Sequence, residues 1–169
     1  QIQSAAAMVP CPWFDDFAAW AKARPQLDVG LHLTLTSEWR HYRWTAILPK
    51  TKVPGLYDTD GYMPRTVLEV AMKADAAQVE AEIRAQVERS LARGLRPGHL
   101  DTHMGTLFAQ ASFTKAYLDV AQDYGIPAMV IEMTPKRVAQ FRKQGYPLSP
   151  ELLAVVKAYP GPKLDNFLT

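Results

Sequence analysis

Cysteine and long apolar runs are what this sequence most conspicuously lacks. A single cysteine among 169 residues excludes an internal disulfide, so a secreted, disulfide-stabilised scaffold is not expected. No apolar run approaches the roughly 20 residues that a membrane-spanning helix needs. We therefore expect a cytoplasmic protein with no membrane partner.

An excess of one charge is also missing. The chain carries 19 Lys and Arg against 17 Asp and Glu, which gives a formal net charge of +2 with the two signs intermixed. Nucleic-acid binding normally needs a broad basic surface, so no nucleic-acid partner is expected. Residues 39–44 form a short basic and aromatic run, which keeps a single-strand binder open as an alternative.

Several catalytic signatures are absent as well. There is no P-loop, no dinucleotide-binding glycine fingerprint and no Gly-x-Ser-x-Gly elbow. The composition, 48% hydrophobic and 21% charged, is that of an ordinary globular protein, and the length suits one domain spanning residues 1–169.

Hydrophobic periodicity switches repeatedly between the strand and the helix pattern. This order predicts an α/β fold with a parallel sheet and helical crossovers, either a (β/α) barrel or an open doubly wound sheet. In both architectures sites gather at the carboxyl ends of strands. The expected strands are 4–9, 27–36, 97–103 and 127–132, and the expected helices are 13–23, 74–94, 111–124 and 135–159.

The helix expected over 74–94 has the clearest pattern. Val79, Ile83, Val87 and Leu91 recur every four residues and predict one buried stripe. Charged residues outside this stripe, Glu82 among them, are expected to form a solvated face.

Residues 37–65 are expected to form a long active-site loop. The stretch is rich in Trp, Tyr, Pro and Gly, and irregular segments of this length in compact domains are usually binding loops or lids. Its aromatic rings suit an aromatic wall beside a site. The alternative is a structural crossover with a small core of its own.

Residues 97–103 hold the densest chemistry in the chain. If this segment is extended, His99, Asp101 and His103 share one face of the strand. His32, on the strand expected over 27–36, supplies a further imidazole near a strand end. Imidazoles and a carboxylate together predict a divalent metal site, although a lone histidine is often only a hydrogen-bonded structural residue.

Roles follow from that chemistry. A metal-bound water could hydrolyse an amide or ester, with His32 and His103 as metal ligands. Asp101 would act as a base or orient a ligand, and His99 would orient its neighbours. Cys11 is a weaker candidate nucleophile near His103.

Three segments resemble one family. Residues 4–13, 29–36 and 99–108 are similar, in order, to motifs of the YdjC-like (ChbG/HpnK) carbohydrate deacetylases. The resemblance implies a modified (β/α) barrel that removes acetyl groups from N-acetylated sugars. It also implies a divalent ion, Mg or Zn, held by one Asp and two His, which map onto His32 and His103.

The same resemblance implies a barrel that is incomplete at both ends. The family's metal-binding Asp lies in an Asp-Asp-Phe-Gly segment that would precede Gln1, and a later His-Pro segment implicated in acid catalysis would follow Thr169. Asp15 and Asp16, which precede a Phe, lie after the first strand rather than on it and do not take that role; the helix dipole explains them. Met104 begins a departure from the His-rich tail of some members, which leaves the substrate open.

The sequence therefore predicts a metal-dependent hydrolase that removes an acetyl group from an N-acetylated sugar or a related small molecule. Its partner would be a small-molecule carbohydrate, and a homodimer stays open. A non-catalytic carbohydrate-binding domain and a single-stranded nucleic-acid binder are the alternatives.

Overall fold

The computed structural model describes residues 3–146 and 148–165, and its sheet is parallel. The strands lie in the order β1-β2-β3, so their carboxyl ends meet at one edge. The α/β fold class is confirmed, with a small parallel sheet flanked by helices. The strands are β1 (Ser4–Ala7), β2 (Asp28–Leu33) and β3 (Leu100–Thr102).

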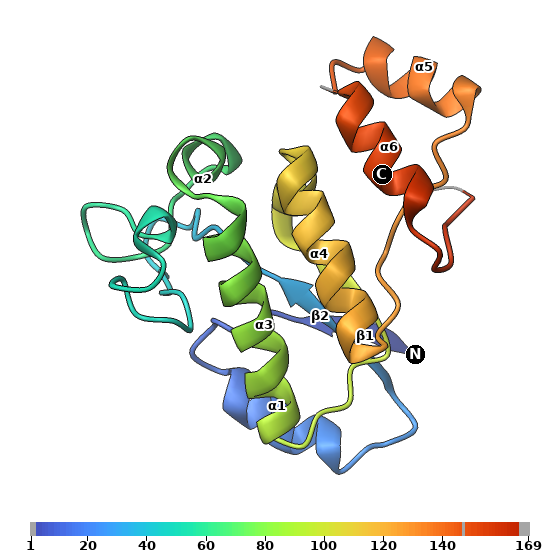
Figure 1. Ribbon diagram of the computed structural model, residues 1–169. Coiled ribbons are helices and arrows are strands. Elements are labelled where there is room, and N and C mark those ends of the chain that lie inside the picture. Colours follow the sequence, from blue (N-terminus) through green and yellow to red (C-terminus); the bar gives the residue numbers. More distant parts are fainter. Residues whose placement is uncertain (1–2, 147, 166–169) are drawn as a thin grey trace.

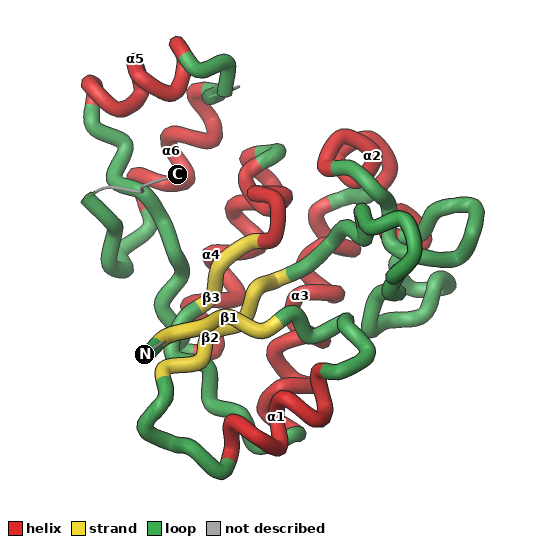
Figure 2. The backbone as a smooth tube through the Cα atoms, turned by 180° about the vertical axis from the view of Figure 1, so that it is seen from behind, coloured by secondary structure: helices red, strands yellow, loops and turns green. Residues whose placement is uncertain are grey.

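Helices α3 and α4 pack against each other over one face of the sheet, while Figure 2 shows the strands in front of them when the molecule is seen from behind. Helices α5 and α6 form a pair beyond α4, against which α6 packs (Figure 1). No helix in the described part of the chain is long and apolar enough to cross a membrane. The α-helices are α1 (Phe14–Lys22), α2 (Val67–Lys73), α3 (Ala76–Ala92), α4 (Ala111–Tyr124), α5 (Pro135–Lys143) and α6 (Pro150–Ala158), and the 3-10 helices are η1 (Pro54–Leu56) and η2 (His103–Phe108).

The core between sheet and helices follows the predicted periodicity. On β2, Leu31 and Leu33 are fully buried and alternate with His32, which is half-buried. On α3, Ile83 and Val87 are also fully buried. Each such side chain stabilises the fold by about 1.5–3 kcal/mol.

The helix expected over 74–94 forms within two residues of its predicted bounds, because its ends are capped. The Asp75 side chain accepts a hydrogen bond from the Gln78 backbone N–H at the start. Gly94 adopts a left-handed φ of 81° just after the end. The predicted stripe stops short of Leu91, which is 42% exposed.

The prediction of a strand over 127–132 was wrong, because this segment makes only isolated bridges within the described residues. Ala128 makes one parallel bridge to Leu100, and Ile131 makes another to Leu164. Because β3 is three residues long, it offers little backbone for a fourth strand to pair with. The helical region expected over 135–159 divides into α5 and α6, with Gly145 in a left-handed turn between them.

The solvated face expected on α3 was wrong for Glu82. This side chain is fully buried and accepts hydrogen bonds from the backbone N–H groups of Ile47 at 2.9 Å and Leu48 at 3.0 Å. Burial raises the pKa of the Glu82 carboxyl above its ordinary value, although these hydrogen bonds oppose the shift. Backbone N–H groups in an irregular loop need hydrogen-bond acceptors, and here the Glu82 carboxylate on α3 supplies them.

One turn further along α3, Gln86 holds the start of the same loop. Its side-chain oxygen accepts from the Thr34 backbone N–H at 3.0 Å, and its Nε2 donates to the Thr34 carbonyl at 2.7 Å. Just after β2 ends, the Gln86 side-chain amide therefore makes the two hydrogen bonds that the backbone of a neighbouring strand would make. The buried polar residues of α3 therefore anchor the long loop that follows β2.

Candidate metal centre

His32 and Asp101 face each other across neighbouring strands. They are paired in the parallel register of β2 and β3, and His32 Nδ1 lies 2.6 Å from Asp101 Oδ1. Both side chains are partly buried. The contact favours a proton on Nδ1, which leaves the lone pair of His32 on Nε2.

His103 follows β3 and begins η2. Directly after it, Met104 and Gly105 take left-handed φ values of 52° and 66°, which turn the chain sharply away from the strand. The His103 ring packs edge-on against Trp44, with 6.4 Å between ring centroids. On its outer side, His103 Nε2 lies 3.0 Å from Glu38 Oε2.

The inner nitrogens of the two histidines converge. His103 Nδ1 lies 3.2 Å from His32 Nε2. With a proton on each outer nitrogen, facing Asp101 and Glu38, both inner nitrogens would carry lone pairs. Two lone pairs at this distance repel each other unless a cation lies between them. The donor set therefore fits a metal ion.

Glu38 was missed at the sequence level. It lies in the long loop, five residues beyond the end of β2, where no local pattern marks it. Burial opposes its ionisation, but the hydrogen bond with His103 and a backbone hydrogen bond outweigh this and hold the pKa of the Glu38 carboxyl below its usual range. The only available signal was a carboxylate shortly after a strand's carboxyl end.

His99 shares the sheet face with Asp101 but has a different partner. Its Nδ1 lies 3.5 Å from Asp28 Oδ2. Its ring covers Gly30, where an added Cβ would lie 2.3 Å from His99 Nε2. The structure thus brings His32, Asp101 and His103 together and places His99 beside them, over a glycine.

Cys11 and Asp15 have other surroundings. Burial, helped by the negative charge of Glu38, raises the pKa of the Cys11 thiol to about 11, so the thiolate needed by a nucleophile is scarce at neutral pH. Asp15 accepts hydrogen bonds from Arg93 at 2.7 Å and from Arg89 at 3.1 Å. It therefore ties α1 to α3.

The basic and aromatic run at 39–44 does not present one continuous surface. Trp44 is buried and its Nε1 donates to the Thr36 carbonyl at 2.8 Å. Arg43 Nη2 donates to Asp58 Oδ2 at 2.7 Å, and the Arg43 side chain is 6% exposed. With one charge paired and one ring buried, the run does not favour the single-strand alternative.

The candidate metal centre offers two converging imidazoles, those of His32 and His103. Within residues 3–146 and 148–165, no group of three or more His, Cys, Asp or Glu side chains is arranged to hold an ion. His32 and His103 would therefore need a further ligand.

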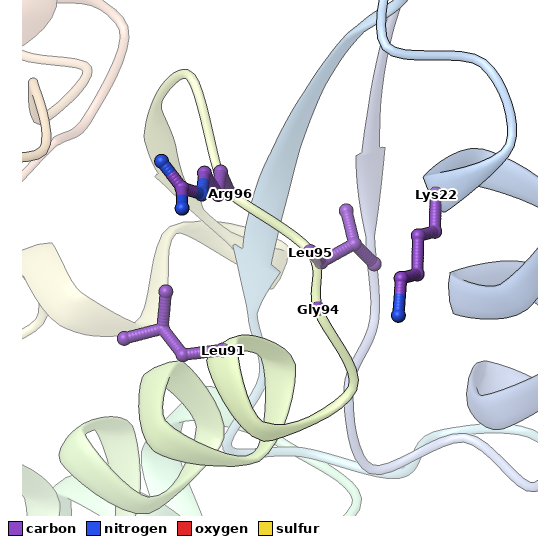
Figure 3. Close-up of a pocket in the computed structure, with 5 residues that line it drawn as sticks. All are labelled: Lys22, Leu91, Gly94, Leu95 and Arg96. Carbon is purple, nitrogen blue, oxygen red and sulfur yellow. The ribbon is translucent and has the colours of Figure 1, made fainter.

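A hollow lies away from this site, on the side where β2 and β3 begin (Figure 3). Lys22 at the end of α1 approaches Gly94 there, and Leu91, Leu95 and Arg96 complete the lining. No carboxylate, imidazole or thiol lines it. The hollow therefore offers no hydrolytic chemistry.

Comparison with known proteins points to the same family as the sequence motifs. The family model described as YdjC-like protein matches residues 1–162. The chain is 36% identical over 114 residues to a carbohydrate deacetylase of Thermus thermophilus, covering 68% of this chain and 41% of that protein. A carbohydrate deacetylase of Geobacillus stearothermophilus is 34% identical over 102 residues, covering 60% of this chain and 38% of that protein.

A solved structure agrees with the fold. A protein from Enterococcus faecalis V583, provisionally described as a cellobiose-phosphate cleavage protein, superposes with a TM-score of 0.70 and 25% identity. The match covers 95% of this chain and 67% of that structure. Against the two deacetylases, by contrast, this chain spans less than half of their length.

Proposed function

Because this chain belongs to the YdjC-like family, we propose that the protein removes an acetyl group from an N-acetylated sugar, using a divalent metal ion held by His32 and His103. The observation that carries the proposal is the 3.2 Å approach of His103 Nδ1 to His32 Nε2. The relatives named as carbohydrate deacetylases support the substrate class.

The distance suits one shared ion. Two nitrogens that each bind a metal at about 2.0–2.1 Å lie roughly 3 to 3.4 Å apart. Imidazole is a common zinc ligand, whereas magnesium usually prefers oxygen, so both ions belong in the test. The family resemblance implies an Asp as a third ligand beside the two histidines.

A bound divalent ion would lower the pKa of a coordinated water towards neutrality and polarise the acetyl carbonyl. Asp101 accepts the N–H of His32 and so keeps His32 Nε2 free for the ion. Glu38 does the same for His103. Since Asp101 Oδ1 is occupied by His32, we assign Asp101 the orienting role rather than that of a base. His99 lies against Asp28 and is assigned no contact with the ion.

The experiment measures acetate release from N-acetylglucosamine by the intact protein, before and after chelation and after adding back Zn²⁺ or Mg²⁺. Release that disappears on chelation and returns with one of the ions supports the proposal. Metal-independent release contradicts the assigned ion. Sugar binding without any acetate release contradicts the hydrolase and favours the non-catalytic carbohydrate-binding domain.

A further inference from the structure

Trp39 lies beside the candidate metal centre and presents 61% of its surface to solvent. It directly follows Glu38, whose carboxylate contacts His103 at 3.0 Å. We propose that Trp39 is the platform on which the pyranose ring of the substrate stacks. This inference rests on the proposed function, because it concerns the sugar that carries the acetyl group.

The indole of Trp39 lies near the Glu38 carboxylate, because it is among the groups that lower the pKa of that carboxyl. The same carboxylate lies 3.0 Å from His103 Nε2. An exposed indole in this place keeps its flat faces available for apolar contact. Glu38 therefore neighbours both the exposed indole and the imidazole of His103.

The backbone under Trp39 is held from the opposite side of the loop. Arg65 Nη1 donates to the Trp39 carbonyl at 3.2 Å and to the Glu38 carbonyl at 3.4 Å. The Ser37 N–H donates to the Pro64 carbonyl at 2.7 Å. A loop backbone held in this way loses little conformational freedom when a ligand arrives, so more of the stacking energy appears as affinity.

The other tryptophans lack this combination of exposure and position. Trp44 is 4% exposed. Trp20 is covered by the Arg24 guanidinium, 4.4 Å from its ring centroid, at the end of α1 that leads towards the start of β2. Trp13 is more exposed, but it lies at the start of α1 and not in the loop that carries Glu38.

The ligand class follows from the chemistry of the indole face. That face is apolar and carries the negative part of the ring quadrupole. A pyranose offers the complement, a face of C–H groups beside the acetamido substituent. A linear acetamide has no such face, so the platform should recognise the ring and not the acetyl group.

The test compares two substrates that share the acetamide, N-acetylglucosamine and N-acetylethanolamine, in the intact protein. Trp39→Ala should raise the KM for N-acetylglucosamine by about 3- to 10-fold and leave the KM for N-acetylethanolamine unchanged. Trp39→Phe keeps an aromatic face and should recover most of the loss. Trp20→Phe is the matched control and should behave as the unaltered protein does.

Equal losses for both substrates, or a Trp39→Phe variant as impaired as Trp39→Ala, would overturn the platform. Calorimetric binding of N-acetylglucosamine separates this result from a failure of the proposed function. If the protein binds the sugar through Trp39 but releases no acetate, the deacetylase proposal fails and the platform stands. If acetate release persists and Trp39→Ala leaves the affinity for the sugar unchanged, the platform fails and the deacetylase stands.

Discussion

Glu38 Oε2 lies 3.0 Å from His103 Nε2, although 65 residues separate the two in the chain. The pair repeats the contact between Asp101 and His32, in which the carboxylate also binds the outer nitrogen of the ring. Both imidazoles of the site are therefore oriented in the same manner, one by a neighbouring strand and the other by a loop. Carboxylates in this position commonly fix the tautomer and ring orientation of metal-ligand histidines.

Removing Glu38 should weaken metal binding without unfolding the protein. Glu38→Ala takes away the acceptor of the His103 N–H, and loss of such a partner typically costs about 10–100-fold in metal affinity. Glu38→Gln keeps an oxygen acceptor and should recover part of that loss. Zn²⁺ titration calorimetry measures the effect, with His41→Ala, an exposed loop substitution, as the control. Unchanged affinity in Glu38→Ala would show that this carboxylate does not orient a ligand.

Asp101 and His99 should differ in their effect on the ion. Asp101→Ala removes the acceptor at 2.6 Å from His32 Nδ1, so metal affinity should fall by roughly 10–100-fold. His99→Ala removes a ring that lies against Asp28, and affinity should change by less than about threefold, within the range of a surface substitution. Comparable losses in the two variants would mean that His99 belongs to the site after all.

Glu82 should make stability depend on pH. Its folded-state pKa is raised by burial, so its contribution to the free energy of unfolding is fully present below the unfolded value near 4.5 and is lost as the pH rises through the folded value. The difference in unfolding free energy between the unaltered protein and Glu82→Gln should therefore be largest near pH 4 and shrink above it. Urea unfolding at pH 4, 5.5 and 7 measures this difference. If the free energy of unfolding of the unaltered protein rises with pH relative to that of Glu82→Gln, the assignment is contradicted.

Gly55 should not tolerate a side chain. An added Cβ would lie 2.3 Å from the Lys73 carbonyl oxygen and 2.6 Å from the Ala74 Cα, both backbone atoms at the end of α2. Gly55→Ala should therefore lower the free energy of unfolding by about 1–3 kcal/mol. Gly98→Ala is the matched control, because its Cβ would meet the side chain of Asp28, which can rotate away. Equal stability of the two variants in urea unfolding would show that the backbone at the end of α2 can shift to make room for the added Cβ.

The histidine pair was predictable because its signals are local. His32 and His103 both lie near the carboxyl ends of strands, and parallel strands bring such ends to one edge of the sheet. The burial of Glu82 was not predictable, since amphipathic patterning assigns a charged residue to the solvent unless its partner is known. That partner is the backbone of residues 47 and 48, which belongs to an irregular loop without periodicity.

The loop itself shows the same limit. Its role as a neighbour of the site could be expected from its length and composition, but the division of labour among its aromatic residues could not. Trp39 is exposed and Trp44 buried, although both occur in the same short run. The difference arises from tertiary contacts, the Thr36 carbonyl for Trp44 and Arg65 for the backbone of Trp39. Helix α2 was missed although its capping box of Thr66 and Glu69 is a local signal in the sequence.

The shared ion is tested most directly by the metal stoichiometry of the intact protein and of its His32→Ala, His103→Ala and doubly substituted forms. Zn²⁺ and Mg²⁺ titrations should show one site in the unaltered protein for at least one of the ions. Each single variant should lose that site, the double variant should be no worse than either, and His41→Ala should retain it. Full occupancy in either single variant would contradict the assignment of His32 and His103 to one ion.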